Sequence, residues 1–341
     1  MDIAKSDKSM SLPREPPPGL LCTDLVLNLT LRCPLHCSHC CYRSEAKISD
    51  TMRQSEMERV IREAATLGSV RTVHFNGGDP FLLPDLMMSG IRLASRFGLR
   101  AAAVTSAFFA KTPQRAMATL EPMALAGLSE ISVSYDDMHA AFLSPRHLVN
   151  LIDAVQMLDL KAYVSVTIEP GSRIDKTHVR RLLGPDLDET RVHIYEVGIN
   201  TTGRAADLVD AAGRRDRAAA AHVYHGPCRT VLRSIQVASD GRVLPCCGVL
   251  PHSANMVLGR ADKPGGLLDA LRTAAQDPLW KLIASEGPVE LIAEATAGTD
   301  SAVSRSEFDG ICSACDRLFN EPHLLHLARR RSIERVPPST A

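Results

Sequence analysis

The sequence predicts an α/β fold, in which a partial (β/α)6 TIM-like barrel of parallel strands precedes a smaller C-terminal α+β domain. Two observations lead to this prediction. From residue 24 to residue 199, six short runs rich in strand-forming residues alternate with longer runs of helical period. After about Asp210 this alternation ends, and a hairpin pattern follows. Repeated βα units favour a parallel sheet, and six of them can curl into a barrel whose active site lies at the carboxyl ends of the strands.

The expected elements alternate in chain order. An open, doubly wound sheet is the alternative to a barrel, because periodicity alone does not distinguish the two. Strands are expected at residues 24–30, 72–76, 100–106, 130–135, 161–168 and 191–199, and helices at 55–67, 84–97, 113–126, 145–158 and 176–183.

The C-terminal part has a different pattern. Residues 234–244 predict a hairpin that turns at Asp240-Gly241, residues 267–283 a helix, and residues 286–309 a loop or insertion. The tail carries Arg329-Arg330-Arg331 and is expected to be mobile, with its charge solvated. We therefore divide the chain into a disordered N-terminal extension (1–21), the barrel (22–210), the second domain (211–327) and a mobile basic tail (328–341).

The charge balance argues against polyanionic partners. The chain has 39 basic and 39 acidic residues, so nothing in its net charge favours nucleic acid or an anionic membrane surface. Met1 to Gly19 lacks the apolar stretch of a signal peptide, and no segment approaches the ~20 apolar residues of a membrane span. We expect a cytoplasmic protein.

Ten cysteines are unusual in a reducing compartment unless they bind metal or do redox chemistry. They fall into two groups. The first comprises Cys22, Cys33, Cys37, Cys40 and Cys41, and the second Cys228, Cys246, Cys247, Cys312 and Cys315.

Three cysteines of the first group, Cys33, Cys37 and Cys40, directly follow the first expected strand, so their thiols converge on one loop. Close thiolates select zinc or iron-sulfur clusters, and zinc would more typically take paired Cys-x-x-Cys arms. Three ligands on a four-iron cubane leave one iron open to a small molecule. The alternative is a triplet of buried structural cysteines.

This Cys-x3-Cys-x2-Cys pattern resembles the signature of the radical S-adenosylmethionine superfamily. The resemblance implies a [4Fe-4S] cluster whose open iron is chelated by S-adenosylmethionine. It also implies reductive cleavage of that cosubstrate to methionine and a 5′-deoxyadenosyl radical, with electrons from a flavodoxin- or ferredoxin-type donor. His39 stands where the family often places an aromatic ring near the adenine.

A second motif follows the second expected strand. Asn76-Gly77-Gly78-Asp79-Pro80 resembles the family's Gly-Gly-Glu-Pro segment, which binds the ammonium group of the cosubstrate, although Asp79 replaces the commoner glutamate. Read alone, it would be an ordinary turn. Thr105, Ser106 and Ser134 at later strand ends are further candidate contacts to the cosubstrate.

Three polar residues follow the fourth expected strand. Asp136, Asp137 and His139 are candidate catalytic residues for proton transfer or substrate binding. The alternative is a turn in which Asp137 caps the next helix.

The second cysteine group resembles the C-terminal auxiliary-cluster domains of the same superfamily, called SPASM or, when shortened, twitch. The resemblance implies one auxiliary [4Fe-4S] cluster held by Cys228, Cys246, Cys312 and Cys315. Cys247 is either the ligand in place of Cys246 or a spare thiol, and some related peptide epimerases use such a thiol as a hydrogen-atom donor. A structural zinc site is the alternative for this group. Arg204, in a segment that resembles the family's link between barrel and auxiliary domain, is expected to contact a carboxylate.

Taken together, these features predict hydrogen-atom abstraction from a peptide or small natural product, followed by oxidation, cross-linking or epimerisation. No peptide-recognition domain is evident ahead of the first strand, so a peptide substrate would need a separate carrier protein. One alternative is a radical dehydrogenase of an alcohol on an aminosugar-like metabolite. An alternative of another class is a non-catalytic iron-sulfur or zinc sensor.

Overall fold

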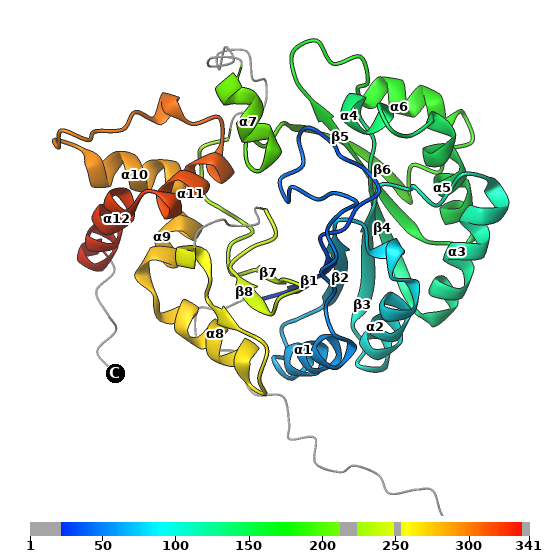
Figure 1. Cartoon of the computed structure of the whole chain (residues 1–341), viewed down its shortest axis with the longest axis horizontal. Helices are drawn as coiled ribbons and strands as arrows, with labels where there is room; N and C mark the ends of the chain where they lie inside the picture. Colours follow the sequence, from blue (N-terminus) through cyan, green and yellow to red (C-terminus); the bar gives the residue numbers. More distant parts are fainter. Residues whose placement is uncertain (1–21, 212–223, 249–253, 336–341) are drawn as a thin grey trace, which may run out of the picture.

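The computed structural model describes residues 22–211, 224–248 and 254–335. Within these residues, nine strands form one sheet in the order β6-β5-β4-β3-β2-β1-β7-β8-β9 (Figure 1). The expected disordered extension, residues 1–21, lies outside the described part. Among the described residues, no helix combines the length and apolar character needed to cross a membrane.

The first six strands form the parallel half of the sheet, and each lies beside its neighbour in sequence. This is the order of a curling barrel and not of a doubly wound sheet. The six predicted strands and five predicted helices are confirmed with small shifts at their ends. The strands are β1 (Asp24–Thr30), β2 (Thr72–Gly77), β3 (Arg100–Thr105), β4 (Leu128–Ser134), β5 (Lys161–Ile168) and β6 (Val192–Gly198).

Helices cover the outer, convex side of these strands (Figure 1). Several begin at a proline, whose fixed φ and missing N–H suit the first helical turn. They are α1 (Gln54–Thr66), α2 (Pro84–Arg96), α3 (Pro113–Ala126), α5 (Pro145–Met157) and α6 (Lys176–Leu183), with the short η1 (Pro80–Leu82) and α4 (Asp137–Ala140) between strands and helices.

Strand β1 shows how the two faces of the sheet differ. Leu25, Leu27 and Leu29 pack with helix residues in the main hydrophobic core. Because side chains alternate along a strand, the buried Asn28 and Thr30 point to the other, concave face. Asn28 lies beside Asn76 in the β1–β2 register. The concave face therefore carries polar side chains where the convex face carries apolar ones.

The C-terminal part extends this same sheet. The hairpin predicted at residues 234–244 is confirmed as β7 (Ser234–Val237) and β8 (Arg242–Leu244), and β9 (Gly259–Arg260) follows. Strand β7 pairs in parallel with β1, so the second cysteine group is attached to the first strand of the barrel. The remaining elements before the C-terminal helices are α7 (Arg204–Ala211) and η3 (Ala254–Met256).

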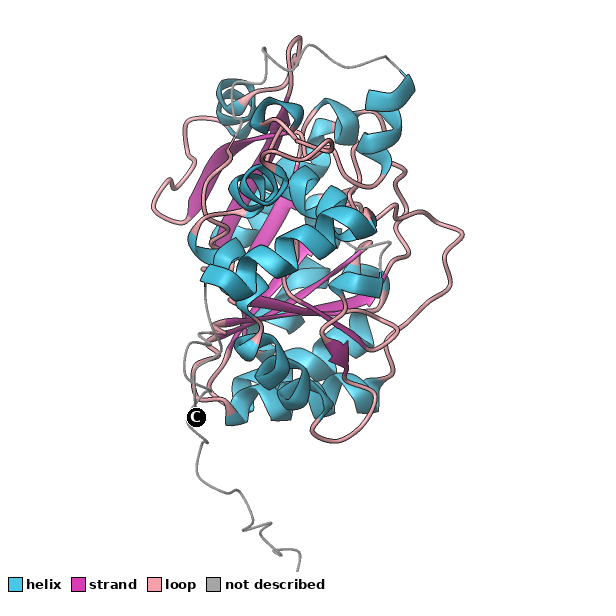
Figure 2. Cartoon of the chain, turned by 90° about the vertical axis from the view of Figure 1, so that its left-hand side faces the viewer, coloured by secondary structure: helices cyan, strands magenta, loops and turns pink. Residues whose placement is uncertain are grey.

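A second hydrophobic core lies among the C-terminal helices, which face the viewer in Figure 2. Trp280 and Phe319 stack at its centre with ring centroids 5.0 Å apart. The elements are α8 (Gly266–Gln276), α9 (Pro278–Ser285), α10 (Pro288–Thr296), η4 (Arg305–Glu307), α11 (Ile311–Asn320) and α12 (Pro322–Arg335).

Two expectations for this region are wrong. The single helix predicted at residues 267–283 breaks at Asp277, whose carboxylate accepts from the Leu279 N–H at 2.9 Å, because Pro278 cannot continue a helix. The loop predicted at residues 286–309 contains α10, whose Val289, Leu291 and Ile292 are buried in the second core.

The mobile tail predicted from residue 328 is also wrong as far as Arg335. Residues 328–335 are the second half of α12, and Ala328 is buried. Arg331 and Arg335 donate to Glu294 at 3.2 and 3.0 Å, and Arg335 also donates to Glu286 at 2.6 Å. These basic residues are held by helix contacts, and residues 336–341 lie outside the described part.

Two glycines at the end of β2 allow close approach to the loop that follows β1. A Cβ at Gly77 would overlap the Thr30 carbonyl oxygen, and one at Gly78 would overlap that of Arg32. The N–H groups of Gly78 and Asp79 donate to these same carbonyls at 2.7 and 2.9 Å. The glycines therefore fix the position of the segment that leads into Cys33.

We expect Gly78→Ala to lower the free energy of unfolding by about 3 kcal/mol or more, because two backbone segments would have to separate. Gly98→Ala is the control, since that glycine has open space around it and a positive φ of +68°. It should cost only about 1 kcal/mol of backbone strain. Urea denaturation of both variants measures the difference, and equal losses would contradict the proposed packing role.

Candidate active site

The loop after β1 brings Cys33, Cys37 and Cys40 together. Cys33 and Cys37 are buried, Cys40 is partly buried, and Leu35 and Leu143 pack with them in one small apolar cluster. Burial, together with the charges of Asp79, Cys37 and Cys40, raises the pKa of the Cys33 thiol to about 12. The three thiols therefore lie close together at the carboxyl end of the parallel strands.

The cysteine loop closes on itself through its backbone. The Cys40 N–H donates to the Cys37 carbonyl, and the Arg43 N–H donates to the Cys40 carbonyl, both at 3.2 Å. The Cys33 N–H donates to Glu45 O, also at 3.2 Å, where the two ends of the loop form a β-bridge between Arg32 and Glu45. These bonds fix Cys33 beside the bridge and place Cys37 and Cys40 on either side of one tight turn.

Arg204 holds this loop from the side of α7. Its Nε donates to the Cys37 carbonyl at 2.9 Å, its Nη2 to the Ser44 carbonyl at 2.6 Å, and its backbone N–H to the Cys40 carbonyl at 3.1 Å. Gly203 has a φ of +58°, and a Cβ there would lie 2.6 Å from Cys40 O. Within the described residues, the Arg204 side chain thus donates to backbone carbonyls and to no carboxylate.

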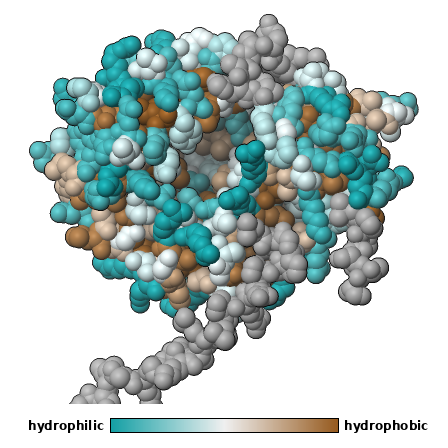
Figure 3. Space-filling view, turned by 180° about the vertical axis from the view of Figure 1, so that it is seen from behind, coloured by the Kyte–Doolittle hydropathy of each residue, from teal (hydrophilic) through white to brown (hydrophobic). Residues whose placement is uncertain are grey.

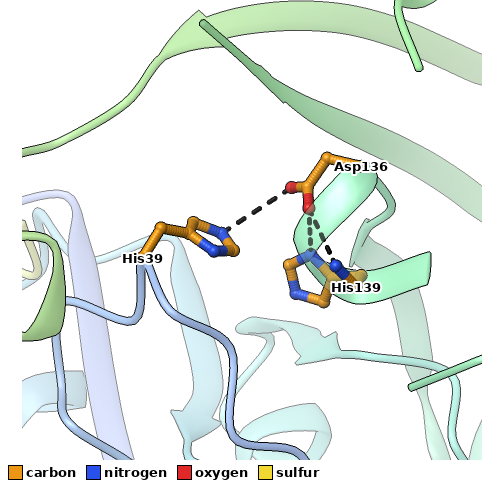
Figure 4. A group of neighbouring side chains, drawn as sticks. All are labelled: His39, Asp136 and His139. Atoms are coloured by element: carbon orange, nitrogen blue, oxygen red, sulfur yellow. Dashed lines mark hydrogen bonds and ion pairs between the residues drawn. The ribbon is translucent and has the colours of Figure 1, made fainter. Parts of the chain in front are cut away.

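His39, Asp136 and His139 form a group beside the cysteines, in which Asp136 and His139 are buried and His39 is partly buried (Figure 4). His139 Nδ1 lies 2.9 Å from Asp136 Oδ1, and His39 Nε2 lies 3.6 Å from Asp136 Oδ2. The two imidazole rings meet edge to face with centroids 5.1 Å apart. Asp136 also caps α4 by accepting from the Met138 and His139 N–H groups at 3.0 Å, so its carboxylate is fixed by the helix start.

The electrostatics of this group separate its two histidines. Burial disfavours the charged form of His139, but hydrogen bonds to Asp136 and Cys37 outweigh it and raise the pKa of His139 to about 10. Burial lowers the pKa of His39 to about 4. Burial opposes ionisation of Asp136 too, yet the hydrogen bond from His139 brings its pKa down to about 2. The ligand atoms of the three side chains all lie within 4.8 Å of one another.

Asp137 is separated from this group. Its carboxylate accepts from the Arg173 and Ile174 N–H groups at 2.8 and 3.1 Å and from Arg173 Nε at 3.1 Å. It anchors the segment after β5, whereas Asp136 is the residue that caps the helix.

Asp79 is the centre of a buried network at the ends of β2 and β3. Its carboxylate accepts from the Thr105 hydroxyl at 2.9 Å and from the hydroxyl and N–H of Ser106 at 2.8 and 2.9 Å. Burial raises its pKa, while these hydrogen bonds oppose the rise. Thr105 and Ser106 thus bind a side chain of the protein. Pro80 is buried at the start of η1, and Ser134 is half-buried at the end of β4.

The second cysteine group gathers beside the concave face. Cys312 and Cys315 lie one turn apart in the first part of α11. Burial raises the pKa of Cys315 well above its usual value, and the charges of Cys246, Cys228 and Cys312 raise it further. A Cβ at Gly248 would lie 3.4 Å from Cys312 Sγ and 3.9 Å from Cys246 Sγ, so glycine leaves space beside both thiols.

Tyr42 connects the two cysteine groups. Its buried hydroxyl donates toward the Cys247 carbonyl at 2.7 Å and Gln236 Oε1 at 2.9 Å, and Asn76 Nδ2 donates to it at 3.3 Å. Tyr42 and Gln236 were not predicted from the sequence, and Asn76 was expected only against the cosubstrate. The only sequence feature that could have indicated a role for Tyr42 was its position two residues after Cys40.

The concave side of the molecule is hollowed, as the view from behind shows (Figure 3). Several buried polar atoms of the concave side have no hydrogen-bond partner within the described structure. They are both side-chain polar atoms of Asn28, His39 Nδ1, Asp136 Oδ2 and Gln236 Nε2. Buried polar atoms normally have partners, so these atoms indicate where ligands or water bind.

Comparison with known proteins agrees with this geometry. Residues 27–143 match the model of the radical SAM superfamily. The putative peptide biosynthesis protein YydG of Bacillus subtilis is 20% identical, over 86% of this chain and 91% of that protein. The PqqA peptide cyclase of Gluconobacter oxydans is 35% identical over 39% of this chain, a match that spans about a third (34%) of the cyclase.

A solved structure shares the fold. BtrN, crystallised in complex with AdoMet and 2-DOIA, superposes with a TM-score of 0.50 at 12% identity, covering 85% of this chain and 98% of that one. The barrel with its cysteine loop and the matched family model show that residues 27–143 form a radical SAM domain.

Proposed function

We propose that this radical SAM enzyme abstracts a hydrogen atom from a peptide and thereby oxidises, cross-links or epimerises it. The observation that carries the proposal is the convergence of Cys33, Cys37 and Cys40 beside the concave side of the barrel. The match to a putative peptide biosynthesis protein along 91% of its length supports a peptide over a small metabolite.

The three thiols fit a [4Fe-4S] cluster. They belong to one small apolar cluster, in which Cys33 and Cys37 are buried, and to a loop that is fixed by Arg204 and by Gly77-Gly78. Fewer than four ligands leave one iron available to the amino acid end of S-adenosylmethionine. When bound, the cluster supplies the electron that splits S-adenosylmethionine into methionine and the hydrogen-abstracting 5′-deoxyadenosyl radical.

Residues of the strand ends are proposed to bind the cosubstrate. The Asp79 carbonyl already accepts from the Leu82 N–H at 3.2 Å, so the carbonyl oxygens of Gly77 and Gly78 are proposed to accept from the ammonium group. Asp79, Thr105 and Ser106 support this segment from behind, and Asn76 and Pro80 precede and follow it in the chain. Ser134, at the end of β4, is proposed as a further contact to the cosubstrate. His39 presents an unpartnered Nδ1, which suits contact with a nucleobase.

Asp136 and His139 are proposed to position the cysteine loop and His39. The His139 ring is hydrogen-bonded to Asp136 and lies near enough to Cys37 for that thiol to raise the His139 pKa, and Asp136 pairs with both histidines. A proton held between Asp136 and His139 thus lies next to a thiolate ligand. Asp137 stabilises the neighbouring loop and is proposed to act only through it.

The second cysteine group is proposed to hold one auxiliary [4Fe-4S] cluster. Cys228, Cys246, Cys312 and Cys315 are its proposed ligands, and the thiols of Cys246 and Cys312 lie on the same side of Gly248, within 3.9 and 3.4 Å of the position its Cβ would take. Cys247 is then the spare thiol and the candidate hydrogen-atom donor to a substrate radical. The external electron donor is of the flavodoxin or ferredoxin type, and a separate carrier protein presents the peptide.

Anaerobic reconstitution with iron and sulfide tests the proposal. The native chain should bind about eight iron atoms, as two [4Fe-4S] clusters require, and should form 5′-deoxyadenosine from S-adenosylmethionine after reduction. The Cys33/Cys37/Cys40→Ala variant should keep about four irons and form none. Cys22→Ala is the control, since Cys22 is buried in the main core away from both groups. A native chain with about four irons and bound zinc would contradict the auxiliary cluster.

Arg204→Ala should release iron from the first site faster. The side chain makes two charge-assisted hydrogen bonds to the cysteine loop, each contributing on the order of 1.5–3 kcal/mol. Arg43→Ala is the matched control, because Arg43 joins the same loop to α7 through an exposed pair with Asp207. Such exposed pairs contribute only about 0–1 kcal/mol.

Chelator-induced bleaching of the cluster absorbance provides the measurement. We expect iron loss to be at least about tenfold faster for Arg204→Ala, since 1.4 kcal/mol corresponds to a factor of ten. The rate of iron loss from Arg204→Lys should be intermediate, because a lysine lacks the planar guanidinium group that donates to both carbonyls at once. Equal rates for Arg204→Ala and Arg43→Ala would overturn the role given to Arg204.

A further inference from the structure

A groove of about 830 Å³ lies on the outer side of the barrel, between α2 and α3. Its apolar lining includes Phe81, Met88 and Phe109, and it adjoins a smaller hollow lined by Phe108. This surface is on the opposite side of the sheet from the concave face (Figure 1). A substrate that must meet the radical at the concave face therefore leaves the groove unused.

Basic side chains surround the groove. Arg92 and Arg96 line it from α2, and Lys111 and Arg115 line the adjoining hollow from the start of α3. All four are exposed, and none forms an ion pair within the described part of the chain. Asp85 is the carboxylate in the lining. The nearby Glu58 accepts from Gln54 and Ser89 and pairs with Arg62 at 3.9 Å. In a chain of zero net charge, this is a local excess of positive charge.

A row of aromatic rings connects the groove with the cysteine loop. Phe81 and Phe109 stack with centroids 4.5 Å apart, and Phe109 meets Phe108 edge to face at 6.0 Å. Phe108 in turn packs against the apolar cluster that contains Cys33 and Cys37. Phe108 therefore belongs both to the lining of the groove and to the packing around the cysteine loop.

We propose that this groove docks an acidic one-electron carrier protein with a low-potential flavin or iron-sulfur centre. The inference rests on the proposed function, which requires one external electron for each S-adenosylmethionine cleaved. The carrier is oxidised by one electron, which passes to the first cluster and then enters the C5′–S bond. That bond breaks, methionine keeps the electron pair, and the unpaired electron remains on C5′.

The character of the surface fits such a partner. Electron-transfer encounters are weak and bury less than about 1,200 Å², so an apolar groove with a charged rim suffices. Complementary charge mainly raises the association rate and makes it sensitive to salt. The carrier delivers its electron from outside the barrel, while the peptide occupies the concave side.

The test uses the reconstituted full chain, with a bacterial flavodoxin and an acidic bacterial ferredoxin as probes. Arg92→Glu/Arg96→Glu reverses two charges of the groove. Lys281→Glu/Arg330→Glu is the control, because it makes the same charge change at exposed positions of α9 and α12. Two quantities are measured for each variant: carrier binding at 20 and 200 mM salt, and 5′-deoxyadenosine formation driven either by the reduced carrier or by dithionite.

We expect the groove variant to bind at least one carrier ten or more times more weakly at low salt and to lose the carrier-driven rate in proportion. Its dithionite-driven rate should stay within twofold of the native one, and the control should match the native chain throughout. Equal carrier binding by groove and control variants, or parallel loss of both rates, would overturn the docking surface. Absence of 5′-deoxyadenosine from the native chain with dithionite would instead count against the proposed function.

Discussion

The site depends on the cysteine loop that follows β1, which is held between two backbone contacts. On one side, Gly77 and Gly78 let the end of β2 lie directly against the chain that leads from Thr30 to Cys33. On the other side, Gly203 and Arg204 close over the carbonyls of Cys37 and Cys40. Neither contact tolerates a larger residue at the glycines. The loop is thus held by protein contacts on both sides.

The sheet places this loop and the second cysteine group beside the same space on its concave side. Strand β1 lies between β2, which supports the loop, and β7, from which the chain continues to Cys246. The Tyr42 hydroxyl then links the loop to the second cysteine group by a hydrogen bond to the Cys247 carbonyl. A substrate in that space would meet both groups of thiols. The convex side has the opposite character, because its apolar residues are used for packing against helices.

Much of the fold and of the first cysteine site could be predicted from the sequence, because the patterns that indicate them are local. The βα alternation indicated the six parallel strands, and the spacing of Cys33, Cys37 and Cys40 after the first strand indicated their convergence. The errors arose where composition was averaged over a long stretch. Residues 286–309 are polar and small on average, yet Pro288 starts a helix whose three apolar residues enter the second core.

The contacts that support the site could not be predicted in the same way. Arg204 binds carbonyl groups about 160 residues away, and Tyr42 bonds to Gln236 and Cys247 about 200 residues away. Asp79 was expected to belong to the cosubstrate, but its carboxylate is used by Thr105 and Ser106. Such pairs depend on the three-dimensional path of the chain and leave no periodic pattern in the sequence.

The proposed chemistry requires that the first site hold a four-iron cluster with one iron open to S-adenosylmethionine. Mössbauer spectroscopy of the chain reconstituted with iron-57 tests this requirement most directly. With two clusters present, adding S-adenosylmethionine should change the signal of about one iron in eight, because a single iron gains ligands. If no iron responds while both clusters remain intact, the first site does not bind the cosubstrate through an open iron, and the proposed radical chemistry is contradicted.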